Sequence, residues 1–115
     1  TDMYEDRIQR AVDNFKQGYN CAQAVTAAFA DLYSLTEEQA LLVSASFGGG
    51  IGRMREVCGA ASGMFILAGM QTGTTDPKDS KGKEYNYQVV QQLAAEFRKR
   101  NGSCHFIHSY GYTFT

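Results

Sequence analysis

The sequence is poor in proline, in cysteine and in unbalanced charge, and each shortage excludes a class of protein. A single proline among 115 residues leaves long stretches uninterrupted for helices. Eleven basic and twelve acidic side chains give a net charge of −1, so no basic surface for nucleic acid or for an anionic membrane is expected. The longest apolar run, Cys58 to Met70, has 13 residues, whereas a membrane span needs roughly 20.

Cysteine usage and the amino-terminal stretch indicate the cellular compartment. Three cysteines are too few, and odd in number, for the disulfide framework of a small secreted protein. The first fifteen residues are amphipathic and charged, without the apolar core of a secretory signal. We therefore expect a soluble, cytoplasmic protein. The motifs CxxC, CxxCH and HExxH are absent, which argues against rubredoxin-like, c-type haem and zincin sites.

The spacing of apolar residues predicts an all-α fold, a small single-domain bundle of about five helices with short loops over residues 1–115. Asn20 with Gln23, and Thr36 with Gln39, have the spacing of helix capping boxes. Residues 105–115 alternate with a period of two and are expected to form an irregular or extended tail. The first four helices are expected at about residues 3–17, 20–32, 36–47 and 58–70. The fifth helix is expected to follow the polar loop 74–83 and to extend as far as Arg100.

The same spacing predicts which side of each helix is buried. On the first helix these residues are Tyr4, Ile8, Ala11, Val12 and Phe15, and on the second Ala24, Val25, Ala28, Phe29 and Leu32. On the last helix they are Tyr85, Val89, Val90, Leu93, Ala94 and Phe97. Each set forms one stripe along a helix with 3.6 residues per turn.

All three cysteines fall at or near the expected start of a helix. Cys21 and Cys104 each follow a good capping residue, and Cys58 lies in the first turn of the fourth helix. A helix N-terminus carries about half a positive charge, which lowers the pKa of a thiol and favours the thiolate. Arg53 and Arg55 would strengthen this effect at Cys58. The alternative is that each cysteine is a small buried residue.

The glycine-rich stretch 48–63 does not have the pattern of a nucleotide-binding loop. GxxxxGK[ST] is absent, and arginine occupies the third glycine position of GxGxxG. The small residues Gly59, Ala60 and Gly63 would instead let a backbone, a partner helix or an inorganic cofactor approach closely. His105 and His108 follow Cys104, but the period of two in this tail argues against a helical ligand pair.

Three stretches carry a resemblance to a known family. GYNCAQAV (residues 18–25), FGGGIGRMREVCGAASG (47–63) and Cys104 after FRKRNGS resemble the redox-active C-GCAxxG-C-C family over roughly residues 8–104. The resemblance implies a small helical redox protein of bacteria or archaea, without a defined substrate. By position, Cys21, Cys58 and Cys104 correspond to three family cysteines. The small residues of the motif correspond to Gly59, Ala60 and Gly63.

This chain also departs from the family pattern. It has Cys-Gly-Ala where the motif has Gly-Cys-Ala, and it has no fourth cysteine. A metal cluster with four cysteine ligands would therefore need its fourth ligand from a histidine, from a second subunit or from further sequence.

These observations lead to two functional hypotheses. In the first, Cys21, Cys58 and Cys104 serve a redox protein that uses either thiol/disulfide exchange or a metal or iron–sulfur centre. In thiol exchange Cys58 would attack and Cys21 would resolve, and the partner would be a redox protein or a small molecule. In the second, the chain is a non-catalytic helical binding or oligomerisation module, a homodimer for example, with structural cysteines. A flavin or haem against the glycine-rich segment is a third idea that the residues do not require.

Overall fold

The computed structural model describes residues 3–101, with side chains from 5 to 100, and is helical over most of this range. The helices are α1 (Met3–Gln17), α2 (Cys21–Phe29), α3 (Glu37–Ser44), α4 (Gly59–Thr72) and α5 (Ser80–Asn101), and the 3-10 turns are η1 (Ala30–Tyr33) and η2 (Ala45–Phe47). The predicted all-α class and number of helices are confirmed for the described residues. None of these helices is long and apolar enough to cross a membrane. The predicted irregular tail lies outside the described residues.

Two local signals in the sequence place α2 and α3. The Asn20 side chain accepts a hydrogen bond from the Gln23 N–H at 2.8 Å, and the Gln23 side chain accepts one from the Asn20 N–H at 3.3 Å. Thr36 and Gln39 make the same pair of bonds, both at 3.0 Å. Each pair satisfies two N–H groups that a helix start leaves without a partner. Both predicted capping boxes are therefore present.

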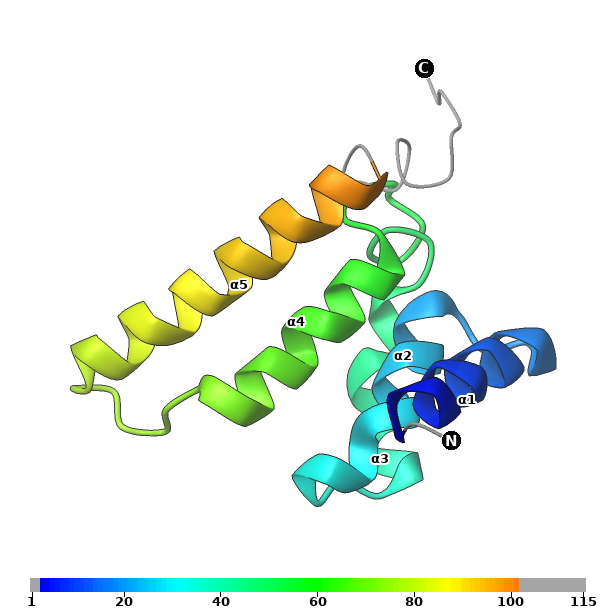
Figure 1. Cartoon of the computed structure of the whole chain (residues 1–115), viewed down its shortest axis with the longest axis horizontal. Coiled ribbons are helices and arrows are strands. Elements are labelled where there is room, and N and C mark those ends of the chain that lie inside the picture. Colours follow the sequence, from blue (N-terminus) through cyan, green and yellow to red (C-terminus); the bar gives the residue numbers. More distant parts are fainter. Residues whose placement is uncertain (1–2, 102–115) are drawn as a thin grey trace.

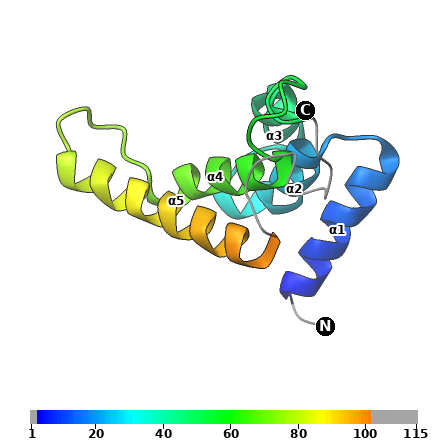
Figure 2. The same ribbon diagram turned by 90° about the horizontal axis from the view of Figure 1, so that it is seen from above.

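The central pair of helices is α2 and α4. Figure 1 shows α5 running antiparallel beside α4, while α1 and α3 pack on α2. Seen from above, α1 and α5 lie on the same side of the α2–α4 pair and diverge from each other (Figure 2). The two cysteines in the described range, Cys21 and Cys58, lie at the starts of the two central helices.

The centre of the bundle is built from small side chains. Ala22, Ala28 and Ala61 are at most 1% exposed, and the largest fully buried side chains in the described range are those of Thr26 and Ser44. Short side chains bring helix backbones close together, because little volume separates the two axes. The close approach of α2 and α4 follows from this composition.

The prediction that α1 buries its apolar stripe is wrong for three of its five residues; Ala11 is half-buried, and the side chain of Tyr4 lies outside the described range. Ile8, Val12 and Phe15 are 58%, 42% and 53% exposed. The reason is that α1 contacts α2 through polar side chains: Arg7 donates to the Ala28 carbonyl at 3.0 Å, and Asn14 donates to the Ala24 carbonyl at 3.2 Å. The apolar stripe is thereby turned towards the space between α1 and α5.

The other predicted stripes are only partly buried. On the second helical segment Ala24 and Ala28 are buried as predicted, but Leu32 is 48% exposed. On α5, Tyr85 is 58% exposed and the remaining predicted positions are half-buried. Much of the apolar surface that the sequence assigns to the core is therefore open in the described part of the chain.

An ion pair joins α1 to η1, the turn that follows α2. Arg7 is 8% exposed and contacts both carboxylate oxygens of Asp31, at 2.6 and 3.1 Å. Its guanidinium also lies 5.9 Å from the centre of the Phe29 ring, within the range of a cation–π contact. The hydrogen bond from Arg7 holds the pKa of the Asp31 carboxyl below its ordinary value, although desolvation acts in the opposite direction.

Candidate thiol site

Cys21 is the first residue of α2, directly after the capping residue Asn20. Its side chain is half-buried and is a thiol in this structure. The capping box determines this position, because it fixes where the helix begins. The prediction that Cys21 lies at the start of a helix is therefore confirmed.

Cys58 is the N-cap residue of α4 and is only 3% exposed. It forms a small apolar cluster with Ala61, against which Val57, Phe65 and Phe97 pack among others. The contact with Phe97 brings the last turns of α5 to this end of the molecule. Cys58 thus lies one residue earlier in the helix than expected, and it is well shielded from solvent.

Gly59 lets the backbones of the two cysteines approach each other closely. A methyl group built on Gly59 would lie 3.1 Å from the Cys21 Cβ and 2.9 Å from the Ala22 nitrogen. Cys58 directly precedes this glycine, and consecutive Cα atoms are about 3.8 Å apart. The backbones that carry Cys21 and Cys58 are therefore immediate neighbours, although 37 positions separate the two residues in the sequence.

Gly63, one turn along α4, makes the same kind of contact. A methyl group there would lie 3.0 Å from the Val25 Cβ and 3.1 Å from the Ala22 carbonyl oxygen. A backbone, a partner helix and an inorganic cofactor were the groups expected to approach the small residues. In the structure, helix α2 of the same chain packs on Gly59 and Gly63. Ala60 points elsewhere and lines an apolar cavity.

The loop before Cys58 packs on the start of α2. A methyl group on Gly48 would lie 2.5 Å from the Asn20 side-chain nitrogen, and that nitrogen donates to the Ala45 carbonyl at 3.1 Å. The glycine therefore lets the loop lie directly on the residue that caps the helix of Cys21. Asn20 thus has a second role besides its cap, which the capping pattern does not predict. The run of three glycines was the signal that pointed to it.

The same loop turns with a left-handed backbone. Residues 49 to 53 all have φ between 57° and 77°, and Arg55 has φ of 63°. The turn is closed by backbone hydrogen bonds, including the Arg53 N–H to the Gly48 carbonyl at 3.1 Å and the Glu56 N–H to the Gly50 carbonyl at 3.0 Å. Positive φ is costly for the branched side chain of Ile51, and such strain persists only when surrounding contacts hold it.

The two arginines of this loop are exposed. Arg53 and Arg55 were expected to favour the thiolate of Cys58, and both lie on the solvent side of the loop. Cys58 itself is buried. Their influence on the thiol stays a prediction.

An apolar cavity of about 270 Å³ opens beside Cys21. Val12 and Phe15 of α1, Val25 of α2 and Ala60 of α4 are among its lining residues. One thiol therefore faces an apolar space that a ligand or another segment can enter. Cys58 does not line this cavity.

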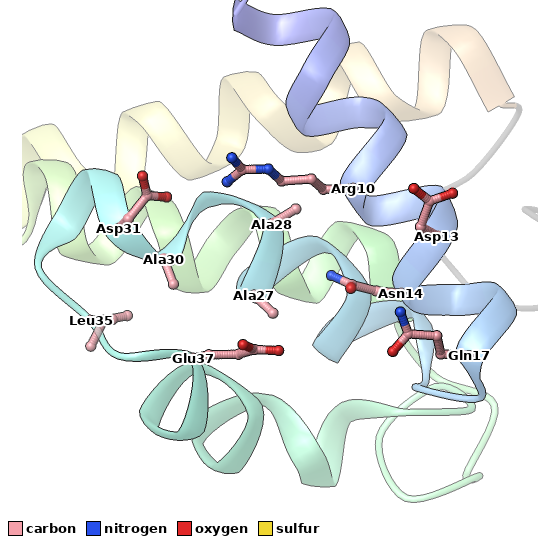
Figure 3. A pocket seen from close by; sticks show the side chains of 10 residues that line it. All are labelled: Arg10, Asp13, Asn14, Gln17, Ala27, Ala28, Ala30, Asp31, Leu35 and Glu37. Atoms are coloured by element: carbon pink, nitrogen blue, oxygen red, sulfur yellow. The ribbon is translucent and has the colours of Figure 1, made fainter.

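A polar cavity of about 540 Å³ lies between α1, the end of α2 and the start of α3, and contains neither described cysteine (Figure 3). Its charged side chains are Arg10, Asp13, Asp31 and Glu37. Since Asp31 is paired with Arg7, the lining otherwise presents one cation and two carboxylates. This mixture gives no strong preference for a ligand of either sign.

The metal-ligand set expected from the sequence is incomplete in the described range. Within residues 3–101, no group of three or more His, Cys, Asp or Glu side chains is placed to hold a metal ion. Cys21 and Cys58 supply two thiols at one junction. Cys104, the third expected ligand, lies outside the described residues, as do His105 and His108.

Comparison with known families agrees with the sequence motifs. The family model described as "Putative redox-active protein (C_GCAxxG_C_C)" matches residues 19–109, a range that includes all three cysteines. No curated protein and no solved structure gives a significant match.

Proposed function

The chain belongs to this redox-active family, and on that premise we propose that it exchanges electrons through Cys21 and Cys58 as a dithiol/disulfide pair. The observation that supports this most directly is the closeness of α4 to Cys21: a methyl group built on Gly59, the residue after Cys58, would lie 3.1 Å from the Cys21 Cβ. A disulfide needs Cβ atoms about 3.8 Å apart. Because a Cβ position is fixed by the backbone, we expect a small shift of α4 against α2 to bring the Cβ atoms of Cys21 and Cys58 to this distance.

Exposure argues for a revised order of the two thiols. The sequence favoured Cys58 as the attacking group because of its arginine neighbours, but Cys58 is 3% exposed. Cys21 is half-buried, lines an apolar cavity and follows a helix cap, where the helix dipole favours a thiolate. We therefore assign the first attack to Cys21 and the resolving step to Cys58.

The proposed reaction conserves atoms and electrons. The Cys21 thiolate attacks one sulfur of a partner disulfide, which forms a mixed disulfide and releases the first partner thiolate. The Cys58 thiolate then attacks the Cys21 sulfur, which closes the Cys21–Cys58 disulfide and releases the second partner thiolate. The partner gains two electrons and two protons, and a dithiol reductant returns the chain to its reduced form.

The alternative redox hypothesis is that the same cysteines hold a metal or iron–sulfur centre. Such centres are held by four ligands in most proteins. The described residues supply two thiols at the junction, which does not complete such a site. Iron and sulfide analysis of protein purified without oxygen tests this reading separately.

The decisive experiment is a redox titration of the full chain with peptide mapping by mass spectrometry. In buffers of graded thiol/disulfide ratio, we expect a two-electron transition and a Cys21–Cys58 disulfide in the oxidised form. Cys21→Ser and Cys58→Ser should each abolish that transition, and Cys104→Ser should preserve it. A transition that survives in Cys21→Ser, or an oxidised chain without this disulfide, would contradict the proposal.

Alkylation rates separate the redox function from the alternative of a module with structural cysteines. In the native reduced chain, Cys21 should react faster than Cys58, because only Cys21 is partly exposed. Asn20→Ala should change the rate at Cys21, since it removes the cap beside the thiol. Thr36→Ala removes an equivalent capping box at α3 and serves as the matched control. Labelling of both cysteines only after unfolding would favour the structural alternative.

A further inference from the structure

An apolar groove of about 490 Å³ runs between α1 and α5, with α2 and α4 as its floor. Ile8 and Val12 of α1, Phe29 of α2, Leu67 of α4 and Leu93 of α5 are among the lining residues. The smaller cavity beside Cys21 continues it, because both spaces share Ala11, Val12, Val25 and Ala60. Together they form one apolar channel along the bundle, on the side where α1 and α5 diverge (Figure 2).

The groove exposes side chains that a soluble protein normally covers. Ile8 is 58% and Val12 is 42% exposed, and both line the groove and belong to the apolar stripe of α1. Continuous apolar surfaces of this kind mark the place where another segment or molecule binds. The occupant must therefore be apolar and must reach the space between α1 and α5.

Residues 102–115 have the composition that the groove requires. They contain no Asp, Glu, Lys or Arg, whereas the preceding 101 residues carry all 23 charged side chains, 11 basic and 12 acidic. Their apolar and aromatic residues are Cys104, Phe106, Ile107, Tyr110, Tyr112 and Phe114. An uncharged segment loses little hydration when it enters an apolar space.

The position of the end of α5 gives this segment access to the groove. Phe97, one turn before that end, packs against the cluster of Cys58 and Ala61, and the neighbouring Ala60 lines both parts of the channel. The α4 residues that line the groove run from Ala60 to Gln71, which is about 17 Å along a helix. An extended chain covers this distance in about five residues. At least fourteen residues follow Asn101.

We propose that residues 102–115 fold back between α1 and α5 and fill this groove. In an extended segment, Phe106, Tyr110 and Phe114 share one face, and this face packs on Ile8, Val12 and Leu93. The proposal does not depend on redox chemistry. A segment attached beside its site competes at millimolar effective concentration, which favours it over a second copy of the chain.

Nuclear Overhauser spectroscopy of the full-length reduced chain, with labelled methyl groups, tests the proposal. We expect contacts between the aromatic rings of residues 106–114 and the methyl groups of Ile8, Val12 and Leu93. A mixture of labelled and unlabelled chains, recorded with isotope filters, distinguishes contacts within a chain from contacts between chains. Contacts seen only between chains would assign the groove to a second copy, and the absence of ring contacts would also overturn the proposal.

A pair of variants provides a second measurement. Phe106→Ala should shift the methyl resonances of Ile8 and Val12, because a ring that packs on them is lost. Tyr85→Ala removes an aromatic ring that is 58% exposed and does not line the groove, so it is the matched control. Unchanged methyl resonances in Phe106→Ala would refute the placement of that residue.

Discussion

Replacing Gly59 by alanine tests the contact that brings Cys21 and Cys58 together. The added methyl group would lie 2.9 Å from the Ala22 nitrogen, 3.1 Å from the Cys21 Cβ and 3.4 Å from the Phe47 carbonyl oxygen. Two of these three neighbours are backbone atoms, which cannot move aside by rotating about a side-chain bond. The methyl group can be accommodated only if α4 moves away from α2.

The expected loss follows from two opposing contributions. Alanine is favoured over glycine by about 1 kcal/mol in a helix interior, and by less at the first helical position, which Gly59 occupies. Overpacking a close contact costs about 1–3 kcal/mol. We therefore expect Gly59→Ala to lower the free energy of unfolding by about 1–2 kcal/mol.

Gly69 in the same helix provides the matched control. A methyl group built there meets nothing within 4 Å, and its φ is not in the left-handed region. Gly69→Ala should therefore raise the free energy of unfolding by about 0.5–1 kcal/mol, since alanine restricts the unfolded chain more than glycine does.

Urea unfolding of the reduced chain, followed by circular dichroism, measures both effects. With a urea dependence of about 1–3 kcal/mol per molar, the midpoints of the two variants should differ by about 1 M. Gly69→Ala should unfold above the wild-type midpoint and Gly59→Ala below it. If Gly59→Ala matched or exceeded the wild type while Gly69→Ala was stabilising, the close contact between α2 and α4 would be wrong.

Three further predictions concern other contacts. The pKa of Asp31 is lowered in the folded state, so its ion pair with Arg7 contributes stability at neutral pH that is lost as the pH falls below the ordinary aspartate pKa. Asp31→Asn should therefore lower the urea midpoint at pH 7, and the midpoints of the variant and the wild type should converge in acid. An equal difference between the two midpoints at both pH values would contradict this. Arg53→Gly should raise the free energy of unfolding by about 1 kcal/mol, because glycine adopts its φ of 65° without strain; thermal unfolding would show a destabilisation if the arginine side chain were needed instead. Asn20→Ala should cost about 1–2 kcal/mol and more than Thr36→Ala, since only Asn20 also donates to the Ala45 carbonyl; equal urea midpoints for the two variants would show that this added bond contributes nothing.

Local signals in this sequence were sufficient to predict the helices and part of the site. The capping boxes at Asn20 and Thr36 depend on residues three positions apart, so they can be read without knowledge of the fold. The close approach at Gly59 was also indicated, because a helix that begins with small residues lacks the side chains that keep neighbours apart. The sequence did not show that α2 would be a segment that approaches it.

Features that depend on distant residues were not predicted. The stripe containing Ile8 and Val12 reads as a buried face, but the buried contacts of Arg7 turn α1 so that this stripe points away from α2. The partner of Arg7 is Asp31, 24 positions away, and no local pattern joins them. The left-handed φ of Ile51 was also unexpected, because a branched residue disfavours it and only the closed loop imposes it.

The loop before Cys58 has a consequence for chemical synthesis of this protein. Five successive residues, 49 to 53, have positive φ angles, which D-amino acids adopt without strain. The turn is therefore a short segment with the mirror-image backbone conformation within a chain of L-residues. A chain assembled with D-arginine at Arg53 would adopt the native φ without strain, whereas the same replacement at a helical position such as Ala61 would disrupt α4. D-amino acids at single positions of this loop would thereby stiffen the segment that packs on the start of α2, next to Cys58.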